Sequence, residues 1–317
     1  MSIRTRRLWP AALLTAGALT LTACGSGTTT ASSQSTATAT VLKADASVAE
    51  ARANNATPDT AATTWSATGA TTIALTGSSA TVSGAGATAS GNAVTITAGG
   101  TYVLSGTLNG QVVVNSPSSD EVKGVLNGAT ITSSTGPAIA VTDAGESVIV
   151  LADGTSNTLT DAKTYADTPE SAPNAALWSS ADLTIGGGGS LTVTGQLNDG
   201  IASKDGLVIT AGTINVTAVD DGIRGKDHVA ITGGNITVSA GGDALKSDNT
   251  TDADSGFVDI SGGTLNLAAG TAKGDGIDAT NDIIISDGTI NVSRSYEGLE
   301  ALNIVIGGGT TEVTTSD

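Results

Sequence analysis

Acidic side chains return at a fixed interval in the second half of the sequence, and we call this series the acidic ladder. Its members are Asp199, Asp221, Asp243, Asp275 and Glu297, at successive steps of 22, 22, 32 and 22 residues. A repeat of this length is typical of a solenoid, in which each repeat forms one coil. Equivalent residues of stacked coils then lie about 4.8 Å apart. Ionised carboxylates repel one another at that distance, so the ladder needs a neutralising partner.

Calcium is one candidate partner, because Ca–O distances of about 2.3–2.6 Å allow an ion to sit between oxygens of adjacent coils. Further acids lie near the ladder in the sequence and could complete the coordination. Asp248 is the weakest of these, since it belongs to an insertion and not to the repeat itself. The residues expected to hold calcium are Asp199, Asp205, Asp220, Asp221, Asp227, Asp243 and Asp248.

The ladder could also form without any metal, in either of two ways. Asp-Gly is ordinary turn chemistry, in which the Asp side chain caps its own backbone and Gly adopts a positive φ. Alternatively, basic residues interleaved with the acids could neutralise them directly. These bases are Lys204, Arg224, Lys226 and Lys246.

A column of residues three places after each ladder acid is expected to face outward, because the aliphatic column beside it faces inward. It contains Ala202, Arg224, Lys246, Asp278 and Glu300, and the preceding coil places Trp178 at its head. A Trp face for a sugar ring beside cations for its carboxylates would suit an acidic glycan. The residues expected to bind this ligand are Trp178, Lys204, Arg224, Lys226 and Lys246. Scattered surface charge remains the alternative.

The elements that must position these side chains are strands. An aliphatic residue stands two places after each ladder acid: Ile201, Ile223, Leu245, Ile277 and Leu299. Only Asp or Asn stands six places after it, and we call this series the Asp/Asn column: Asp205, Asp227, Asn249, Asn281 and Asn303. Short apolar–polar alternations bounded by Gly fill the rest of each repeat. The pattern predicts an all-β, right-handed parallel β-helix of about 22 residues per coil. Aliphatic side chains should stack inside and the Asp/Asn column outside, and residues 161–174 and 248–256 should form excursions.

The start of the chain is typical of an exported lipoprotein. Residues 1–23 combine an Arg-rich beginning with an apolar run too short to span a membrane. The sequence Leu21-Thr22-Ala23-Cys24 resembles a lipobox, which makes Cys24 the expected lipidation site; an ordinary secretory signal is the alternative. Residues 24–64 are rich in Thr, Ala and Ser and should form a flexible tether. The lipid anchor would hold the protein on the extracellular face of a bacterial membrane.

Composition fits one elongated domain over residues 65–317, and we expect a monomer. The formal net charge is -17, which disfavours nucleic acid as a partner. Asp317 falls 20 residues after Glu297, just before the next repeat of the phrase is due. Either the chain continues beyond this residue, or the last coil is left open.

The motifs also resemble a known family, the bacterial carbohydrate-binding β-helix domains. The resemblance covers about residues 70–317 and rests on the stretches Asn174-Ala175-Ala176-Leu177-Trp178-Ser179, Asn198-Asp199-Gly200-Ile201, Asp220-Asp221-Gly222-Ile223-Arg224 and Leu245-Lys246-Ser247-Asp248. It implies a fold similar to family-nine pectate lyases, bound calcium, and binding of cellulose or acidic plant-wall polysaccharide. The family's acidic positions fall on Asp199, Asp220, Asp221, Asp227 and Asp243. Ala244 stands where the family has Gly, which weakens the expectation of calcium at that coil.

The expected function is calcium-dependent, non-catalytic binding of an acidic polyuronate or cellulose. A polysaccharide lyase is the main alternative, because β-elimination needs a calcium-bound uronate and a basic side chain. Lys204, Arg224 or Lys226 could serve as that base. His228 is the only histidine, and no nucleophile pairs with it in the sequence. A structural stalk or adhesin is the third alternative.

Overall fold

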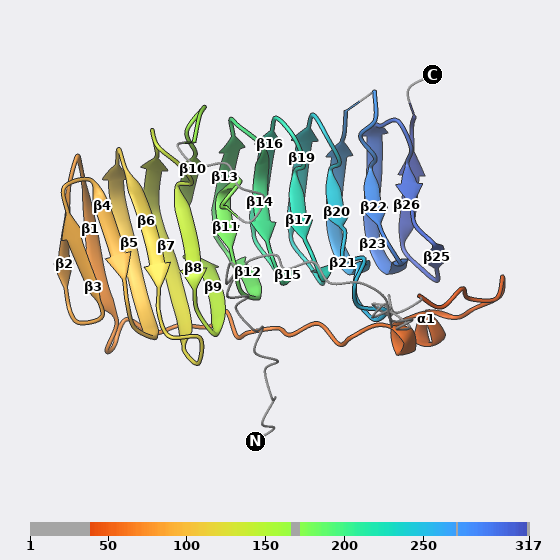
Figure 1. Ribbon diagram of the computed structural model, residues 1–317, viewed down its shortest axis with the longest axis horizontal. Helices are drawn as coiled ribbons and strands as arrows, with labels where there is room; N and C mark the ends of the chain where they lie inside the picture. The colour runs from red at the N-terminus through yellow and green to blue at the C-terminus, as the bar shows by residue number, and fades with distance from the viewer. Residues whose placement is uncertain (1–38, 166–171, 271, 316–317) are drawn as a thin grey trace, which may run out of the picture. The chain divides into compact units, whose positions relative to one another are not determined.

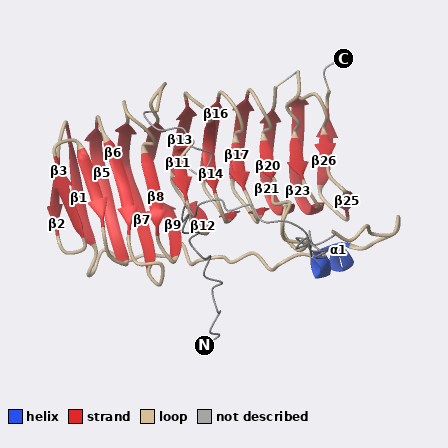
Figure 2. Ribbon diagram, in the orientation of Figure 1, coloured by secondary structure: helices blue, strands red, loops and turns tan. Residues whose placement is uncertain are grey.

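The computed structural model describes residues 39–165, 172–270 and 272–315. Within these ranges nearly all regular structure is strand, with one short helix (Figure 2). The strands stack into a parallel β-solenoid of about 8 turns (Figure 1). The predicted parallel β-helix is therefore confirmed.

The strands form two sheets that run the length of the solenoid. The first sheet contains β1 (Thr71–Gly77), β2 (Ala80–Ser83), β5 (Gly100–Leu108), β7 (Glu121–Thr132), β9 (Glu146–Leu151), β10 (Ser156–Thr160), β12 (Leu183–Gly187), β13 (Ser190–Gly195), β15 (Gly206–Ile209), β16 (Thr213–Ala218), β18 (His228–Ile231), β19 (Asn235–Ala240), β21 (Phe257–Ala268), β23 (Asp282–Arg294), β25 (Asn303–Ile306) and β26 (Thr310–Val313). The second contains β3 (Ala87–Ser90), β4 (Ala93–Ile96), β6 (Gln111–Asn115), β8 (Ile139–Asp143), β11 (Ala175–Ser179), β14 (Asp199–Ser203), β17 (Ile223–Gly225), β20 (Leu245–Ser247), β22 (Ile277–Ala279) and β24 (Leu299–Glu300).

The core is a set of aliphatic ladders between the two sheets. Ile201 pairs in register with Ile223, and Leu245 pairs with Ile277, in the second sheet. All four side chains are fully buried, and Leu299 packs against the same core from the last coil. The predicted interior column is therefore confirmed, and it fixes which side chains of each coil point outward.

Both sheets finish in antiparallel pairs at the N-terminal end of the solenoid. β1 pairs with β2 and β3 pairs with β4 in this way, whereas the later coils stack in parallel. A hairpin at each sheet end turns the first coil away from further parallel pairing.

Residues 39–64 form what we call the N-terminal strap, which contains α1 (Val48–Asn54). The composition of this stretch predicts a flexible tether, whereas the structure shows a helix and ordered contacts. Ser47 and Glu50 form a capping box that starts the helix, because each side chain bonds to the backbone N–H of the other. Ala51 is fully buried. A short helix that is capped and buries one small residue can pack on the solenoid even though its sequence contains few large apolar residues.

The strap lies along the outside of the first sheet and runs against the order of the coils (Figure 1). The backbone N–H of Leu42 bonds to Asn303 in the last coil at 2.9 Å, and Arg52 forms two bonds of 2.7 Å with Asp259. Further along, the carbonyl of Thr64 accepts a bond of 3.2 Å from Lys123. These contacts hold the strap to successive coils.

The Asp/Asn column is more buried than predicted. Asn249, Asn281 and Asn303 are 2%, 6% and 8% exposed, whereas Asp205 and Asp227 are half-buried. The amides are buried because they bond to neighbouring groups, as when Asn249 donates to Asp227 at 2.6 Å. The column therefore ties the coils together at a turn and does not form an open surface.

Several predicted features fall outside this description. Residues 1–23 and Cys24 lie outside the described residues, as do residues 166–171 of the first excursion. Residues 248–256 are described and connect β20 to β21 without a strand. In the described part of the chain, no helix has the length and apolar character needed to cross a membrane.

Candidate metal and carbohydrate site

The acidic ladder lies at or just before the strands of the second sheet, where each coil turns into that sheet. Asp199, Asp221, Asp243 and Asp275 are only 1–6% exposed. One oxygen of each, Oδ1, accepts the backbone N–H of the next ladder member, at 3.3, 2.9, 2.7 and 2.9 Å in order. This oxygen links adjacent coils and does not cap its own turn, and Gly200, Gly222 and Gly276 do not adopt a positive φ. The turn chemistry considered from the sequence is therefore not what the structure shows.

The second oxygens face basic side chains. Lys246 Nζ bonds to Asp243 Oδ2 and lies 3.5 Å from Asp221 Oδ2 and 3.6 Å from Asp278 Oδ2. Burial disfavours the lysine charge, but the carboxylates of Asp221 and Asp243 outweigh it and raise the pKa of Lys246. A protonated amine thus stands where an ion between these two coils would be expected.

Arg224 takes the corresponding place one coil earlier. Its guanidinium bonds to Asp248 Oδ2 at 2.5 Å and lies 3.8 Å from Asp199 Oδ2, which Asn174 also contacts at 2.9 Å. Arg224 Nε and Asp248 Oδ1 are both buried, and neither has a hydrogen-bond partner among the described residues. A buried polar atom without a partner is costly, so these two atoms mark a place suited to a ligand.

The basic residues offset the acids only in part. Burial, followed by repulsion from Asp221, raises the pKa of Asp199 to about 7 in spite of Arg224. Burial also raises the pKa of Asp221 to about 6, although Lys246 acts against it. Burial is thus the main cause of both raised pKa values, and repulsion between neighbouring acids adds to it.

The remaining predicted metal residues divide between two places. Asp220 is exposed, and its Oδ1 and that of Asp221 both approach Gly242, where an added Cβ would lie 2.6 and 2.7 Å from them. Asp205 and Asp227 instead lie in the Asp/Asn column, where burial, followed by repulsion from Asp182 and Asp227, raises the pKa of Asp205. The structure therefore does not gather the seven predicted residues into one site.

The outward row predicted for the second sheet is present. Trp178 pairs with Ala202, which pairs with Arg224, then Lys246 and Asp278. The prediction that Trp178 binds a sugar ring is wrong, because the residue is only 4% exposed and packs with Ala175 and Ala202. It offers no open face for a sugar, and its Nε1 is buried without a partner among the described residues.

Lys204 and Lys226 are half-buried and follow the strands that carry this row. Burial, then the charges of Arg224 and Lys226, lower the pKa of Lys204, while Asp248 and Asp199 act in the opposite direction. Lys204 therefore belongs electrostatically to the Arg224–Asp248 cluster. A lowered pKa increases the fraction of lysine that is a neutral amine, and the neutral amine is the form that can accept a proton.

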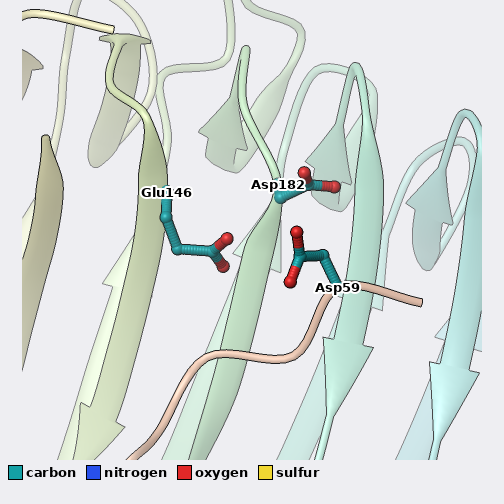
Figure 3. A group of neighbouring side chains, drawn as sticks. All are labelled: Asp59, Glu146 and Asp182. Carbon is teal, nitrogen blue, oxygen red and sulfur yellow. The ribbon is translucent and has the colours of Figure 1, made fainter. Parts of the chain in front are cut away.

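Two groups of three carboxylates have oxygens within 4.8 Å of one another in the described residues, and neither was predicted as a site. Asp275, Glu297 and Glu300 lie at the C-terminal end of the acidic ladder, where no described base intervenes as Lys246 does. The repeat pattern could have indicated this group, since two members belong to the ladder. The second group is Asp59, Glu146 and Asp182 (Figure 3), whose members lie far apart in the sequence and share no motif.

Comparison with known proteins identifies the chain's relatives. Residues 90–317 match the family model for carbohydrate-binding domain-containing proteins. A protein of that description from Acetivibrio thermocellus is 46% identical over 201 residues, which cover 62% of this chain and 69% of that protein. A solved structure of a polysaccharide lyase-like protein from C. thermocellum, a gadolinium derivative, is 35% identical with a TM-score of 0.70, covering 76% of this chain and 99% of that one. The protein described here therefore belongs to the carbohydrate-binding domain-containing family.

Proposed function

We propose that this protein binds a plant-wall polysaccharide, an acidic polyuronate or cellulose, with the help of calcium and without cleaving it. The binding surface is the outward row of the second sheet around Arg224 and Lys246. We further propose that Cys24 carries a lipid anchor and holds the protein on the outer face of the bacterial membrane.

The observation that carries the proposal is the pair of partnerless buried atoms at this row. Arg224 Nε is a donor and Asp248 Oδ1 an acceptor, and both adjoin the ion pair that the two residues form with each other. A uronate offers a carboxylate to the arginine and hydroxyl groups to the aspartate. One acidic sugar could therefore satisfy both atoms.

Calcium is supported by the chemistry of the donors near this row. Asp275, Glu297 and Glu300 bring three carboxylates within 4.8 Å, and carboxylate oxygens are the ligands that calcium prefers. These residues would hold the ion, with Asp221 and Asp243 contributing where Lys246 leaves room. One solved relative is a gadolinium derivative, and gadolinium shares calcium's preference for oxygen ligands. When bound, calcium would supply positive charge to an acidic polymer that a protein of formal charge -17 otherwise repels.

The environment of Lys204 favours a second candidate, a polysaccharide lyase. Its pKa is lowered by burial, Arg224 and Lys226, which is what a base in β-elimination requires. One relative is described as polysaccharide lyase-like. In this alternative Arg224 would bind the uronate carboxylate and Lys204 would take the proton from the carbon beside it.

One pair of assays separates these candidates. Binding of polygalacturonate and of cellulose is measured by calorimetry and sedimentation with calcium or with chelator, and the ultraviolet absorbance of unsaturated ends is followed in parallel. We expect binding that chelator abolishes, no absorbance change, and loss of binding in Arg224→Ala. Steady product formation that Lys204→Ala abolishes would identify a lyase. If neither substrate binds and no product forms, the protein is a structural stalk or adhesin.

A further inference from the structure

The N-terminal strap covers an apolar row on the outer side of the first sheet (Figure 1). Val148, Val208 and Ile284 alternate along their strands with residues of the core and therefore point outward. Each is nevertheless at most 1% exposed. Ala61 of the strap packs against the cluster that contains Val148, and Arg52 lines the same small pocket as Ile284. The strap is thus seated on the sheet.

The beginning of the strap is held by the last coil. Asn303 in β25 donates its side-chain N–H to the carbonyl of Thr40 at 2.9 Å, and its side-chain oxygen accepts the backbone N–H of Leu42 at 2.9 Å. The helix α1 then lies against Gly307, directly after β25, where an added Cβ would lie 2.5 Å from Val48 Cγ2. The first contacts of the strap are therefore with the last coil.

The helix makes the strongest contacts of the strap. Besides its two bonds to Asp259, Arg52 donates to Ser286 Oγ at 2.8 Å, and Asn55 donates to Asp282 Oδ2 at 2.6 Å. Hydrogen bonds to an ionised group are roughly twice as strong as neutral ones. These partners lie on β21 and β23, which pair with each other, and β23 pairs with β25. The second set of contacts is therefore with the coils next to the last one.

The end of the strap contacts earlier coils. Ala61 bonds to Thr184 in β12, and the carbonyl of Thr64 bonds to Lys123 in β7. Along the strap, the contacts thus run from the last coil toward the first, in the order of the chain. A pull on the chain before residue 39 therefore loads them in series, beginning at Asn303, and each contact breaks before the next one bears the load.

We propose that the strap is a reserve of chain that tension from the N-terminal side releases while the coils stay folded. Each strap contact lies at the surface, where a hydrogen bond or an ion pair contributes little to stability. A coil is held differently, because its strand hydrogen bonds and its buried aliphatic residues must separate together. Full release of residues 39–64 frees about 90 Å of chain, at about 3.4 Å per residue.

The inference rests on the proposed function for the source of the tension. A lipid at Cys24 and a polysaccharide on the outward row would pull on the chain from two sides. The strap lies between these two points in the chain and contacts the first sheet, whereas the outward row is on the second sheet. Release would therefore lengthen the connection to the anchor without disturbing the proposed binding surface.

Single-molecule force spectroscopy tests the release without lipid or polysaccharide. The full chain with Cys24→Ser is held by an N-terminal tag and by a click-reactive residue that replaces Thr237, which is exposed on β19. We expect a first step of at most about 90 Å, at a force below that at which the coils unfold. Arg52→Gln should lower the force of this step, whereas Lys163→Gln, which changes an exposed residue away from the strap, should leave it unchanged.

A disulfide shows whether this step belongs to the strap. A Cβ built at Gly307 lies 3.7 Å from Val48 Cβ, which suits a disulfide between Val48→Cys and Gly307→Cys. When this disulfide is formed, the first step should be limited to the residues before 48, about 30 Å of chain, and reduction should restore its full length. The reduced form of the same variant controls for misfolding.

Three outcomes of the pulling experiment would overturn the proposal: a first step longer than the strap can supply, no step before the coils unfold, or a step that the oxidised disulfide leaves unchanged. An unchanged force in Arg52→Gln would also overturn it. Absence of lipidation or of polysaccharide binding would remove the source of tension but leave these steps as they are. Failure of the proposed function is therefore distinguishable from failure of this inference.

Discussion

Asp221 contacts Asp243 through one carboxylate oxygen and leaves the other for Lys246. Its Oδ1 accepts the backbone N–H of Asp243 at 2.9 Å, and its Oδ2 lies 3.5 Å from Lys246 Nζ. Hydrogen bonding between coils and charge neutralisation thus occur together at this residue, because each uses a different oxygen. The two roles can be separated by substitution.

Replacing Asp221 by Asn or by Ala should affect the free energy of unfolding differently. Asn keeps an oxygen for the buried N–H of Asp243, whereas Ala leaves that group unpaired at a cost of about 1–3 kcal/mol. Urea unfolding in chelator measures both variants against the parent. Equal destabilisation by Asn and Ala would show that the hydrogen bond contributes nothing.

Removing the Lys246 charge should strengthen calcium binding at the ladder. In Lys246→Met, the carboxylates of Asp221 and Asp243 lose their resident cation, so a calcium ion no longer competes with a bound amine. Calorimetric titration should show affinity higher by about tenfold or more. Lys163→Met removes an exposed charge elsewhere and is the control. Weaker calcium binding in Lys246→Met would contradict the idea that the amine occupies the ion's place.

The metal-free protein should lose stability as the pH rises from about 4 to about 7. The folded-state pKa of Asp199 is about 7 and that of Asp221 about 6, whereas unfolded Asp titrates near 3.9. The folded state therefore holds protons that the unfolded state releases, and this contribution is complete below pH 4 and lost through pH 7. Denaturant unfolding at several pH values measures it, and Asp199→Asn should flatten the curve. If the free energy of unfolding depends on pH equally in the parent and in Asp199→Asn, Asp199 is not the cause.

Calcium should compete with these protons. Its stabilising effect should be small near pH 4, where the ladder carboxylates are protonated, and should grow toward pH 7. Melting temperatures with and without calcium at each pH measure the effect. If calcium raises the melting temperature equally at every pH, the ion binds away from the ladder.

A charge in the aliphatic ladder should disrupt the stacking of coils. Ile223 is fully buried between Ile201 and Leu245, so Ile223→Asp would place an unpaired carboxylate in the core. We expect loss of cooperative unfolding by circular dichroism. Ile223→Val is the control and should cost only about 0.5–1.5 kcal/mol. A cooperative transition in Ile223→Asp near that of the parent would contradict the packing.

The sequence was sufficient to predict the solenoid because every coil repeats the same in–out pattern, and Ile201 and Ile223 are stacked as that pattern requires. It was insufficient for Trp178, because a residue can face outward from a strand and still be covered by neighbouring parts of the chain. The sequence was also insufficient for the strap, because a stretch rich in Thr, Ala and Ser resembles a linker even where it contains a capping box such as Ser47–Glu50. The Asp59 cluster could not be predicted at all, since tertiary contact alone unites its members.

The direction of the N-terminal strap has a consequence for the order of folding. Residues made early in synthesis, around Leu42 and Arg52, contact Asn303 and Asp259, which are made near the end. The part of the strap around Leu42 and Arg52 therefore has no docking surface until the last coils exist, although Ala61 and Thr64 can already contact Thr184 and Lys123. Closing so long a loop is entropically costly and comes late. Docking of the whole strap is thus the last step of folding, because its helical part has partners only when the final coils have formed.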